Sequence, residues 1–174
     1  MNQTIADIVA RRSVKRYTDQ PVELSLIQEV VKTGTYAPTG MNRQSPVIIA
    51  VTRRELRDRL SRMNAAVMGT DTDPFYGAPV VLAVLASKDA PTRLYDGSLV
   101  MANMMIAAQS LGLGSCWIHR AREIFDSEEG REILRQLGVE GEYEGIGFCI
   151  VGHSAPNAVK PRSERKPDYV VWVN

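Results

Sequence analysis

The sequence predicts a single domain over residues 1–174 that mixes helices with buried strands. Apolar runs of strand length occur at residues 47–51, 79–86 and 145–152, each next to Gly, Pro or polar residues. Other segments carry apolar side chains at helical spacing, most clearly residues 95–111. A chain of 174 residues is long enough to bury one full core.

The composition is that of an ordinary globular protein, with 44% hydrophobic and 24% charged residues. The net charge of +1 gives no overall field toward nucleic acid or an anionic membrane, so we expect neither partner. Cys116 and Cys149 lie in apolar runs, which indicates buried thiols in a reducing compartment. The N-terminus lacks an apolar secretory core, and no uncharged apolar run approaches membrane-spanning length. We therefore expect a cytoplasmic protein.

Two helices are expected in the first 35 residues. We expect Thr4 to cap a short helix with one apolar face formed by Ile5, Ile8 and Val9. We expect Pro21 to open a second helix that ends near Gly34. Its apolar positions repeat at helical spacing: Leu24, Ile27, Val30 and Val31.

A charged helix is expected at residues 53–63, after the first strand. The polar stretch at 69–75 that follows fits either a lid or a disordered loop. Residues 95–111 are apolar almost all the way round a helix, so this helix must be covered on most sides. It is covered either by a sheet and a partner subunit or by its own core alone.

The last third alternates strand and helix signals. Gly112 and Gly114 permit a close backbone approach at the start of a short apolar run. Asp126 or Ser127 is expected to cap a helix through Leu137. Residues 169–173 have the composition of a strand, and a terminal strand is stable only when docked in its own sheet or a neighbour's.

Residues 11–17 form a basic cluster with one hydroxyl, and they read Arg-Arg-Ser-Val-Lys-Arg-Tyr. Arginine offers a flat fork that matches phosphate oxygens, and lysine offers a mobile point charge. We interpret the cluster as a site for the phosphate of a cofactor; the alternative is a solvated basic helix end. A second basic cluster occupies residues 160–167.

Residues 36–46 contain Pro, Gly and Asn, which argue against regular structure. Thr39, Asn42 and Gln44 are uncharged donors and acceptors of the kind that read the edge of a heterocycle. The alternative is an ordinary polar connection between two apolar elements.

Three other kinds of chemistry find little support. Cys116 and His119 would point to opposite faces of a strand, so a zinc site is not expected, and neither is any other metal. Gly112-x-Gly114 lacks the later glycine and acidic residue of a dinucleotide fingerprint. No Ser–His–Asp spacing or thiolate motif indicates covalent catalysis.

The basic cluster at 11–17 resembles the opening motif of the FMN-dependent nitroreductase family. Three further segments resemble that family in the same order, namely residues 37–44, 111–118 and 165–167. The resemblance implies an α+β nitroreductase-like fold with a mostly antiparallel central sheet flanked by helices. It also implies an intertwined homodimer, in which the C-terminal strand of each subunit joins the partner's sheet and two FMN sites lie at the interface.

The resemblance also implies roles for particular residues. Arg11 and Ser13 correspond to phosphate ligands, Lys15 to a cation near flavin N1 and O2, and Arg165 to a late phosphate ligand. The backbone of Ile118 and His119 corresponds to the segment that faces the ring. The full implied cofactor-binding set is Arg11, Arg12, Ser13, Lys15, Pro38, Thr39, Gly40, Asn42, Trp117, Ile118, His119, Arg162 and Arg165.

The chain departs from the family pattern in places. Ser45-Pro46 stands where the family often has Pro-Trp, so a usual ring-supporting Trp is absent. Ser163 stands where some members have a second cation, a role open to Lys160 or Arg162. Asn64 resembles a family Asn that reads the flavin pyrimidine.

The activity implied by the resemblance is that of a flavoprotein oxidoreductase. Hydride from NADH or NADPH would pass through flavin N5 to a nitroaromatic, a quinone or a similar flat small molecule. No protein side chain would act as the catalytic group, and Lys15 would tune the flavin. The alternative is a flavin-binding or flavin-carrier protein without turnover.

Overall fold

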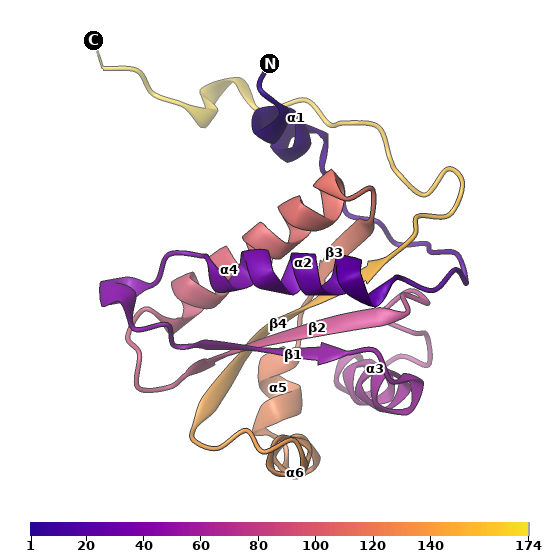
Figure 1. Cartoon of the computed structure of the whole chain (residues 1–174), viewed down its shortest axis with the longest axis vertical. Helices are drawn as coiled ribbons and strands as arrows, with labels where there is room; N and C mark the ends of the chain where they lie inside the picture. Colours follow the sequence, from indigo (N-terminus) through magenta and orange to yellow (C-terminus); the bar gives the residue numbers. More distant parts are fainter. Residues whose placement is uncertain (174) are drawn as a thin grey trace.

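A computed structural model of the chain describes residues 1–173. Within these residues, one antiparallel sheet has the strand order β1-β2-β4-β3 (Figure 1). Its strands are β1 (Pro46–Val51), β2 (Val80–Ser87), β3 (Gly114–Ile118) and β4 (Tyr143–Gly152). The strands expected at residues 47–51, 79–86 and 145–152 are confirmed as β1, β2 and β4. The sheet is antiparallel, as the resemblance implies.

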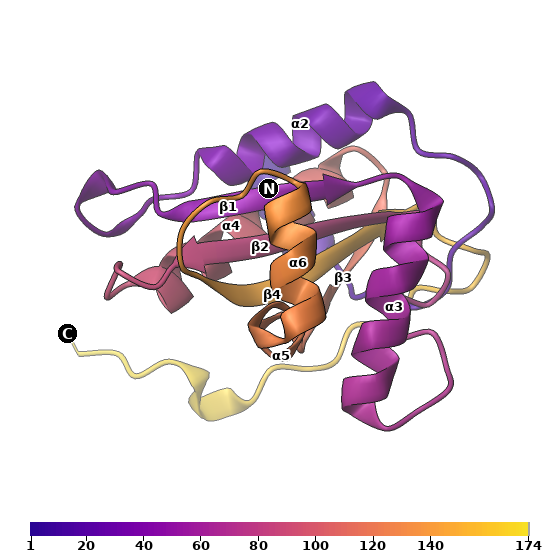
Figure 2. The same cartoon turned by 90° about the horizontal axis from the view of Figure 1, so that it is seen from below.

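Helices cover both faces of this sheet (Figures 1 and 2). α2 (Leu24–Thr35) and α4 (Arg93–Ser110) pack on one face, and α3 (Arg54–Met68), α5 (Ala121–Asp126) and α6 (Glu128–Gln136) pack on the other. α1 (Gln3–Ala10) lies against α4. No helix among the described residues is long and apolar enough to cross a membrane.

The continuous apolar run in β2 follows from its central position. Val81, Ala83 and Leu85 enter the core under α3, α5 and α6, whereas Val80, Leu82 and Val84 enter the core under α2 and α4. A strand that is buried on both faces has no reason to alternate with polar residues.

Glycines in β4 let helices approach the sheet closely. A Cβ added at Gly145 would lie 2.3 Å from the carbonyl carbon of Ala121, so only glycine fits under the start of α5. The β2–β4 register shifts just beyond this point, and Ile146 fits against Gly97 of α4. The backbone of α5 explains Gly145, and the Ile146 side chain explains Gly97.

Two expectations about where helices begin are corrected, whereas α2 does end beside Gly34, as expected. Asn2 rather than Thr4 caps α1, because its side chain accepts the Thr4 N–H at 2.9 Å. α2 begins at Leu24 instead of Pro21. Gly34 lies inside the last turn of α2, where a Cβ would crowd Ile48 and Met104. The short helix α5 was not expected, although Ser127 does cap α6 by accepting the Gly130 N–H.

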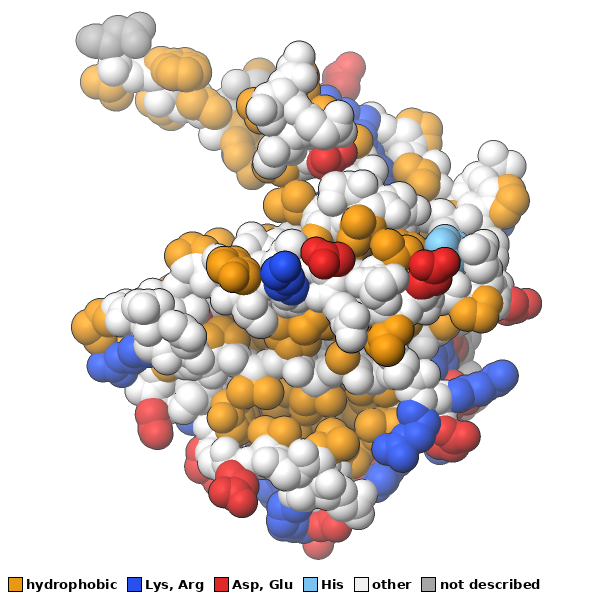
Figure 3. All heavy atoms as spheres, viewed as in Figure 1, with side chains coloured by type: hydrophobic (Ala, Val, Ile, Leu, Met, Phe, Trp, Pro, Cys, Tyr) orange, Lys and Arg blue, Asp and Glu red, His pale blue; other side chains and the backbone are white. Residues whose placement is uncertain are grey.

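After β4 the chain first pairs with residues 16–18 through His153, Ser154 and Ala155, and the later part of the tail then extends away from the body (Figure 1). It contains one 3-10 turn, Pro167–Tyr169, and residues 170–173 form no strand. Trp172 is 82% exposed, and apolar atoms of this tail stand clear of the body (Figure 3). The strand expected at 169–173 is therefore not formed in a single chain, which offers its backbone groups no neighbouring strand.

Candidate functional site

Residues 11–18 run along the ends of β3 and β4. The Val14 N–H donates to the carbonyl of Ser115 at 2.9 Å, and the Thr18 N–H donates to the carbonyl of His153 at 2.9 Å. The Tyr17 hydroxyl donates back to the Val14 carbonyl at 2.8 Å. The basic cluster therefore has a fixed place against the sheet and is not a loose helix end.

Three polar side chains of this cluster converge near Cys116 of β3. Burial raises the pKa of the Cys116 thiol, and a hydrogen bond from Ser13 and the positive charges of Lys15 and Arg11 oppose that rise. Ser13 pairs with Ser115 in an isolated bridge, and residues 11, 13 and 15 alternate along an extended segment, so their side chains point to the same side. Ser13 and Lys15 are also exposed, and Arg11 is half-buried, so a ligand can reach them.

Arg12 has a different role from its neighbours. Its Nη1 lies near three carbonyl oxygens at the end of α1, those of Val9 at 2.8 Å, Ala10 at 3.0 Å and Arg11 at 2.8 Å. These carbonyls have no partner within the helix, so the guanidinium caps α1. The geometry makes Arg12 a residue that positions the cluster, and its expected direct contact with a cofactor has less support than that of Arg11.

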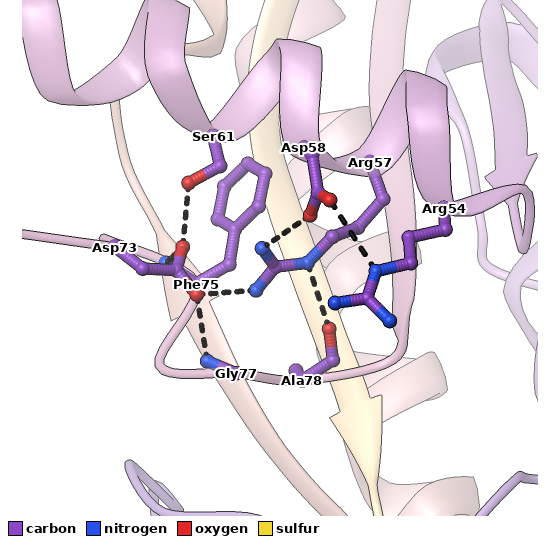
Figure 4. Close-up of polar contacts among 8 residues, drawn as sticks. All are labelled: Arg54, Arg57, Asp58, Ser61, Asp73, Phe75, Gly77 and Ala78. Atoms are coloured by element: carbon purple, nitrogen blue, oxygen red, sulfur yellow. Dashed lines mark hydrogen bonds and ion pairs between the residues drawn. The ribbon is translucent and has the colours of Figure 1, made fainter. Parts of the chain in front are cut away.

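The loop after α3 is held by a single carboxylate (Figure 4). Asp73 accepts hydrogen bonds from Arg57 at 2.5 Å, Ser61 at 2.6 Å, and the N–H groups of Phe75 at 2.9 Å and Gly77 at 2.7 Å. Burial opposes ionisation of Asp73, but these donors outweigh it and hold its pKa below the ordinary value. Residues 69–75 were expected to form either a lid or a disordered loop. The structure shows an ordered loop, so it does not support the second interpretation.

This anchored loop carries Tyr76, which sequence reasoning missed. The Lys15 Nζ lies 5.5 Å from the centroid of the Tyr76 ring, within the range of a cation–π contact. Tyr76 has a φ of +53°, a left-handed conformation that is uncommon outside glycine. No local pattern signals this contact, because Lys15 and Tyr76 are brought together only by the packing of the loop.

The outer edge of β3 is open beyond Ser115. β3 pairs with β4 on one side only, and the Ser115 carbonyl faces the opposite side, toward Val14. Because backbone groups alternate in direction along a strand, the N–H groups of Trp117 and His119 also point to this outer edge. A flat ligand lying there would meet the backbone of Trp117 and, as the resemblance implies, of His119, whereas the same alternation turns the Ile118 N–H toward β4.

The side chains of Trp117 and Ile118 pack against other parts of the protein. The Trp117 indole lies over Gly147, and its Nε1 is buried with no hydrogen-bond partner within residues 1–173. Ile118 is buried in the core among residues of α5 and α6. The expected contact of Ile118 with a cofactor therefore has little support, whereas Trp117 is half-buried and its backbone N–H faces the outer edge.

Asn64 ties α3 to the turn after β3. This residue is fully buried, its Nδ2 donates to the His119 carbonyl at 2.8 Å, and its Oδ1 accepts from the Arg120 Nε at 2.8 Å. With both ends of its amide engaged, Asn64 supports the turn and is not placed to read a pyrimidine ring. Arg120 has a φ of +75°, which costs a residue with a Cβ about 1–2 kcal/mol.

Asp96 of α4 anchors the loop at residues 36–46 through hydrogen bonds. The Gly40 N–H donates to Asp96 Oδ1 at 3.0 Å, and the Ser45 hydroxyl lies 3.3 Å from Oδ2. The loop adopts left-handed backbone at Met41, Asn42 and Gln44, and Asn42 and Pro38 are exposed. A cavity of about 260 Å³ lies beside the loop, lined in part by Thr39, Gln44, Ala37, Gly34 and Val100.

The two expected halves of the site lie at opposite ends of α4. The 36–46 loop is fixed near the beginning of that helix, and residues 13–15 lie beside β3, which follows its end. A helix of 18 residues is about 27 Å long, so one chain does not bring Asn42 to Lys15 (Figure 1). Arg162 and Arg165 are exposed, and no hydrogen bond or ion pair joins them to the 11–17 cluster within residues 1–173.

The residues described here do not form a metal centre. Among residues 1–173, no group of three His, Cys, Asp or Glu side chains is arranged to hold an ion. Cys116 and Cys149 are buried free thiols, and burial raises the pKa of Cys149 to about 12.

The fold and the site together define a class of protein: an α+β domain with an antiparallel sheet and a basic segment fixed at one sheet edge. The chain belongs to the nitroreductase family, whose model matches residues 8–72 and 64–153.

Individual relatives agree with this assignment. A nitroreductase with bound FMN from Bacteroides fragilis superimposes with a TM-score of 0.91, with 26% identity and 100% of both chains covered. The NADPH-flavin oxidoreductase of Vibrio harveyi is 28% identical over 93% of this chain and 70% of its own length. The NAD(P)H-dependent FMN reductase of Bacillus subtilis is 24% identical over 93% of this chain and 70% of its own.

Proposed function

We propose that this protein is an FMN-dependent oxidoreductase that takes hydride from NADH or NADPH and passes it to a nitroaromatic, a quinone or a similar flat acceptor. The observation that carries the proposal is that Ser13 and Val14 are bound to Ser115 of β3, which fixes Arg11, Ser13 and Lys15 beside the edge of that strand. The B. fragilis structure, similar over the whole chain, contains bound FMN.

The donor set fits FMN. Arg11 and Ser13 offer a guanidinium and a hydroxyl to a phosphate, which is the chemistry of a built phosphate site. Arg165, with Arg162 as the second late cation, would reach the same phosphate from the tail. The open N–H groups of Trp117 and His119 would lie along the ring.

Lys15 would provide the electrostatic part of the chemistry. FMN supplies the capacity to accept and return a hydride at N5. Lys15 would lie near N1 and O2, where negative charge grows on reduction, and a fixed cation there stabilises that charge. Tyr76 would hold the ammonium group in place through its ring.

The complete site would need two copies of the chain. Pro38, Thr39, Gly40 and Asn42 lie too far from Lys15 in one chain, so they would meet the flavin of the partner. The tail would dock on the outer edge of β1, an edge strand with half-buried Val47, Ile48 and Ile49. At the other edge of the sheet, Val14 occupies the start of β3 and the flavin would lie along the rest. Docking would bury the exposed Trp172 and Val173.

One experiment tests the activity. The purified protein is expected to be yellow, or to bind added FMN, with the bound flavin bleached by NADH or NADPH and its colour restored by a nitroarene or quinone. Bound flavin that NADH and NADPH leave oxidised would favour the carrier function instead. A preparation that takes up no FMN would exclude both functions.

A second experiment tests the assembly. Removal of residues 167–174 leaves Arg162 and Arg165 in place but deletes the apolar tail. We expect the shortened protein to dissociate at concentrations at which the full chain is a dimer in size-exclusion chromatography with light scattering. A shortened protein as dimeric as the full chain would contradict the tail exchange.

The cytoplasmic location also stays a proposal, consistent with the two free thiols.

A further inference from the structure

Arg120 stands where β3 ends and α5 begins, next to the edge proposed to hold the flavin ring. It is half-buried, and its left-handed backbone, with a φ of +75°, is a conformation that side chains rarely adopt. Such a conformation persists only where the surroundings hold it. The Asn64 side chain fixes Arg120 here, because its Oδ1 accepts a hydrogen bond from the Arg120 Nε at 2.8 Å.

Asn64 fixes this guanidinium without neutralising it. The Asn64 side chain is buried and oriented by its own donation to the His119 carbonyl at 2.8 Å. An amide carries no charge, so the positive charge of Arg120 stays in full. Its Nη atoms make no hydrogen bond within residues 1–173 and can bind a ligand.

Several arginines of α3 and α5 are neutralised by carboxylates, although the exposed Arg62 of α3 forms no ion pair among residues 1–173. Arg57 forms ion pairs with Asp58 and Asp73, and Arg59 forms one with Glu129. Arg122 forms ion pairs with Asp126 and Glu144. In contrast, Arg120 forms no ion pair among the residues that the structure describes. A fixed cation without a counter-charge in a ligand-accessible place is suited to bind an anion.

FMN itself does not supply the anion that Arg120 would bind. The phosphate is matched by Arg11 and Ser13, and the charge that grows at N1 and O2 is matched by Lys15. β3 continues from Ser115 to Ile118, about 10 Å along the strand, and Arg120 follows two residues later, so it lies beyond the far end of β3 from the contact with Val14. A second substrate, bound against the ring near the end of β3, is the remaining source of negative charge.

We propose that Arg120 is a specificity-determining residue that binds a carboxylate on the electron acceptor, so that this site prefers flat aromatic acceptors with an anionic group. The inference rests on the proposed function, because it assumes that the flavin ring lies along β3. A planar guanidinium matches a carboxylate with two parallel hydrogen bonds, which a neutral substituent cannot form.

The test uses the FMN-loaded protein and two probes that are not reduced, benzoate and benzamide. Their binding is followed by the change in the visible spectrum of the flavin. We expect the wild type to bind benzoate about tenfold or more tightly than benzamide, as for a charge-assisted hydrogen bond. Arg120→Gln and Arg120→Gly are expected to lose this preference while keeping their affinity for FMN. Glycine suits the backbone at this position, so Arg120→Gly guards against a folding defect.

Arg62→Gln is the matched control, because Arg62 is an exposed arginine on α3. It is expected to keep the preference for benzoate. Equal affinity for the two probes in the wild type, or a preference that survives in both Arg120 variants, would overturn the inference and leave the proposed function intact. A rise in the KM for NADPH alone, without an effect on benzoate, would assign the anion to the coenzyme phosphate and also overturn it. Failure to bind FMN would overturn both proposals.

Discussion

The Asp96 carboxylate on α4 accepts a hydrogen bond from the Gly40 N–H at 3.0 Å, and this contact joins residues 56 positions apart. Its other oxygen accepts from Thr92 at 2.9 Å and from Ser45 at 3.3 Å. Asp96 is only 3% exposed, so these donors replace the water that its charge has lost. The position of the 36–46 loop therefore depends on one side chain of the central helix.

Replacing Asp96 with Ala should release this loop. The change leaves the partly buried Gly40 N–H and the Thr92 hydroxyl without their acceptor, so we expect a loss of about 1–3 kcal/mol in the free energy of unfolding, measured in urea. We also expect weaker FMN binding. Asp89→Ala, at an exposed position, should change neither quantity. Equal urea midpoints for the two variants would show that Asp96 does not anchor the loop.

Lys15→Ala should slow reduction of the bound flavin. The variant lacks the cation proposed near N1 and O2, and loss of one preorganised charge-stabilising group lowers such rates by about a hundredfold. The rate is measured by stopped-flow bleaching with NADH or NADPH on protein saturated with FMN. Arg62→Ala, on the exposed side of α3, serves as the control. Similar losses in both variants would count against a role for Lys15.

Asp73→Asn should change how stability depends on pH. The folded protein holds the pKa of Asp73 below its ordinary value of 3.8, so at pH values between the two the unfolded chain binds more protons and stability rises with pH. This contribution is complete above 3.8 and is lost as pH falls through the lower folded value. The stability difference between wild type and Asp73→Asn in urea should therefore shrink below pH 4. Asp71→Asn, an exposed neighbour, should show no such trend.

The two thiols should react slowly with a thiol reagent. Cys116 and Cys149 are buried, and burial raises the pKa of both, so the reactive thiolate is scarce at neutral pH. We expect native protein to release almost no colour with Ellman's reagent, and protein in denaturant to release colour for two thiols. A fast reaction of the native protein would mean that the end of the sheet near Ser13 opens readily.

Much of the fold follows from local patterns. The apolar runs at 47–51, 79–86 and 145–152 became β1, β2 and β4, because long apolar segments of strand length must be buried wherever they occur. The ends of helices were predicted less well, as Asn2 and Leu24 show, because several residues compete for each cap and packing selects among them. The short helix α5 lacks a repeat long enough to be seen.

The sequence by itself determined the elements, the basic cluster at 11–17 and the family resemblance, since these depend on residue type and spacing along the chain. The tertiary structure decided which charges are available: Arg12 caps α1, Arg57 is paired with Asp73, and Arg120 is held by a neutral amide. It also decided that the 36–46 loop and Lys15 are a helix length apart. These are properties of distance between residues far apart in the chain, and no local pattern encodes them.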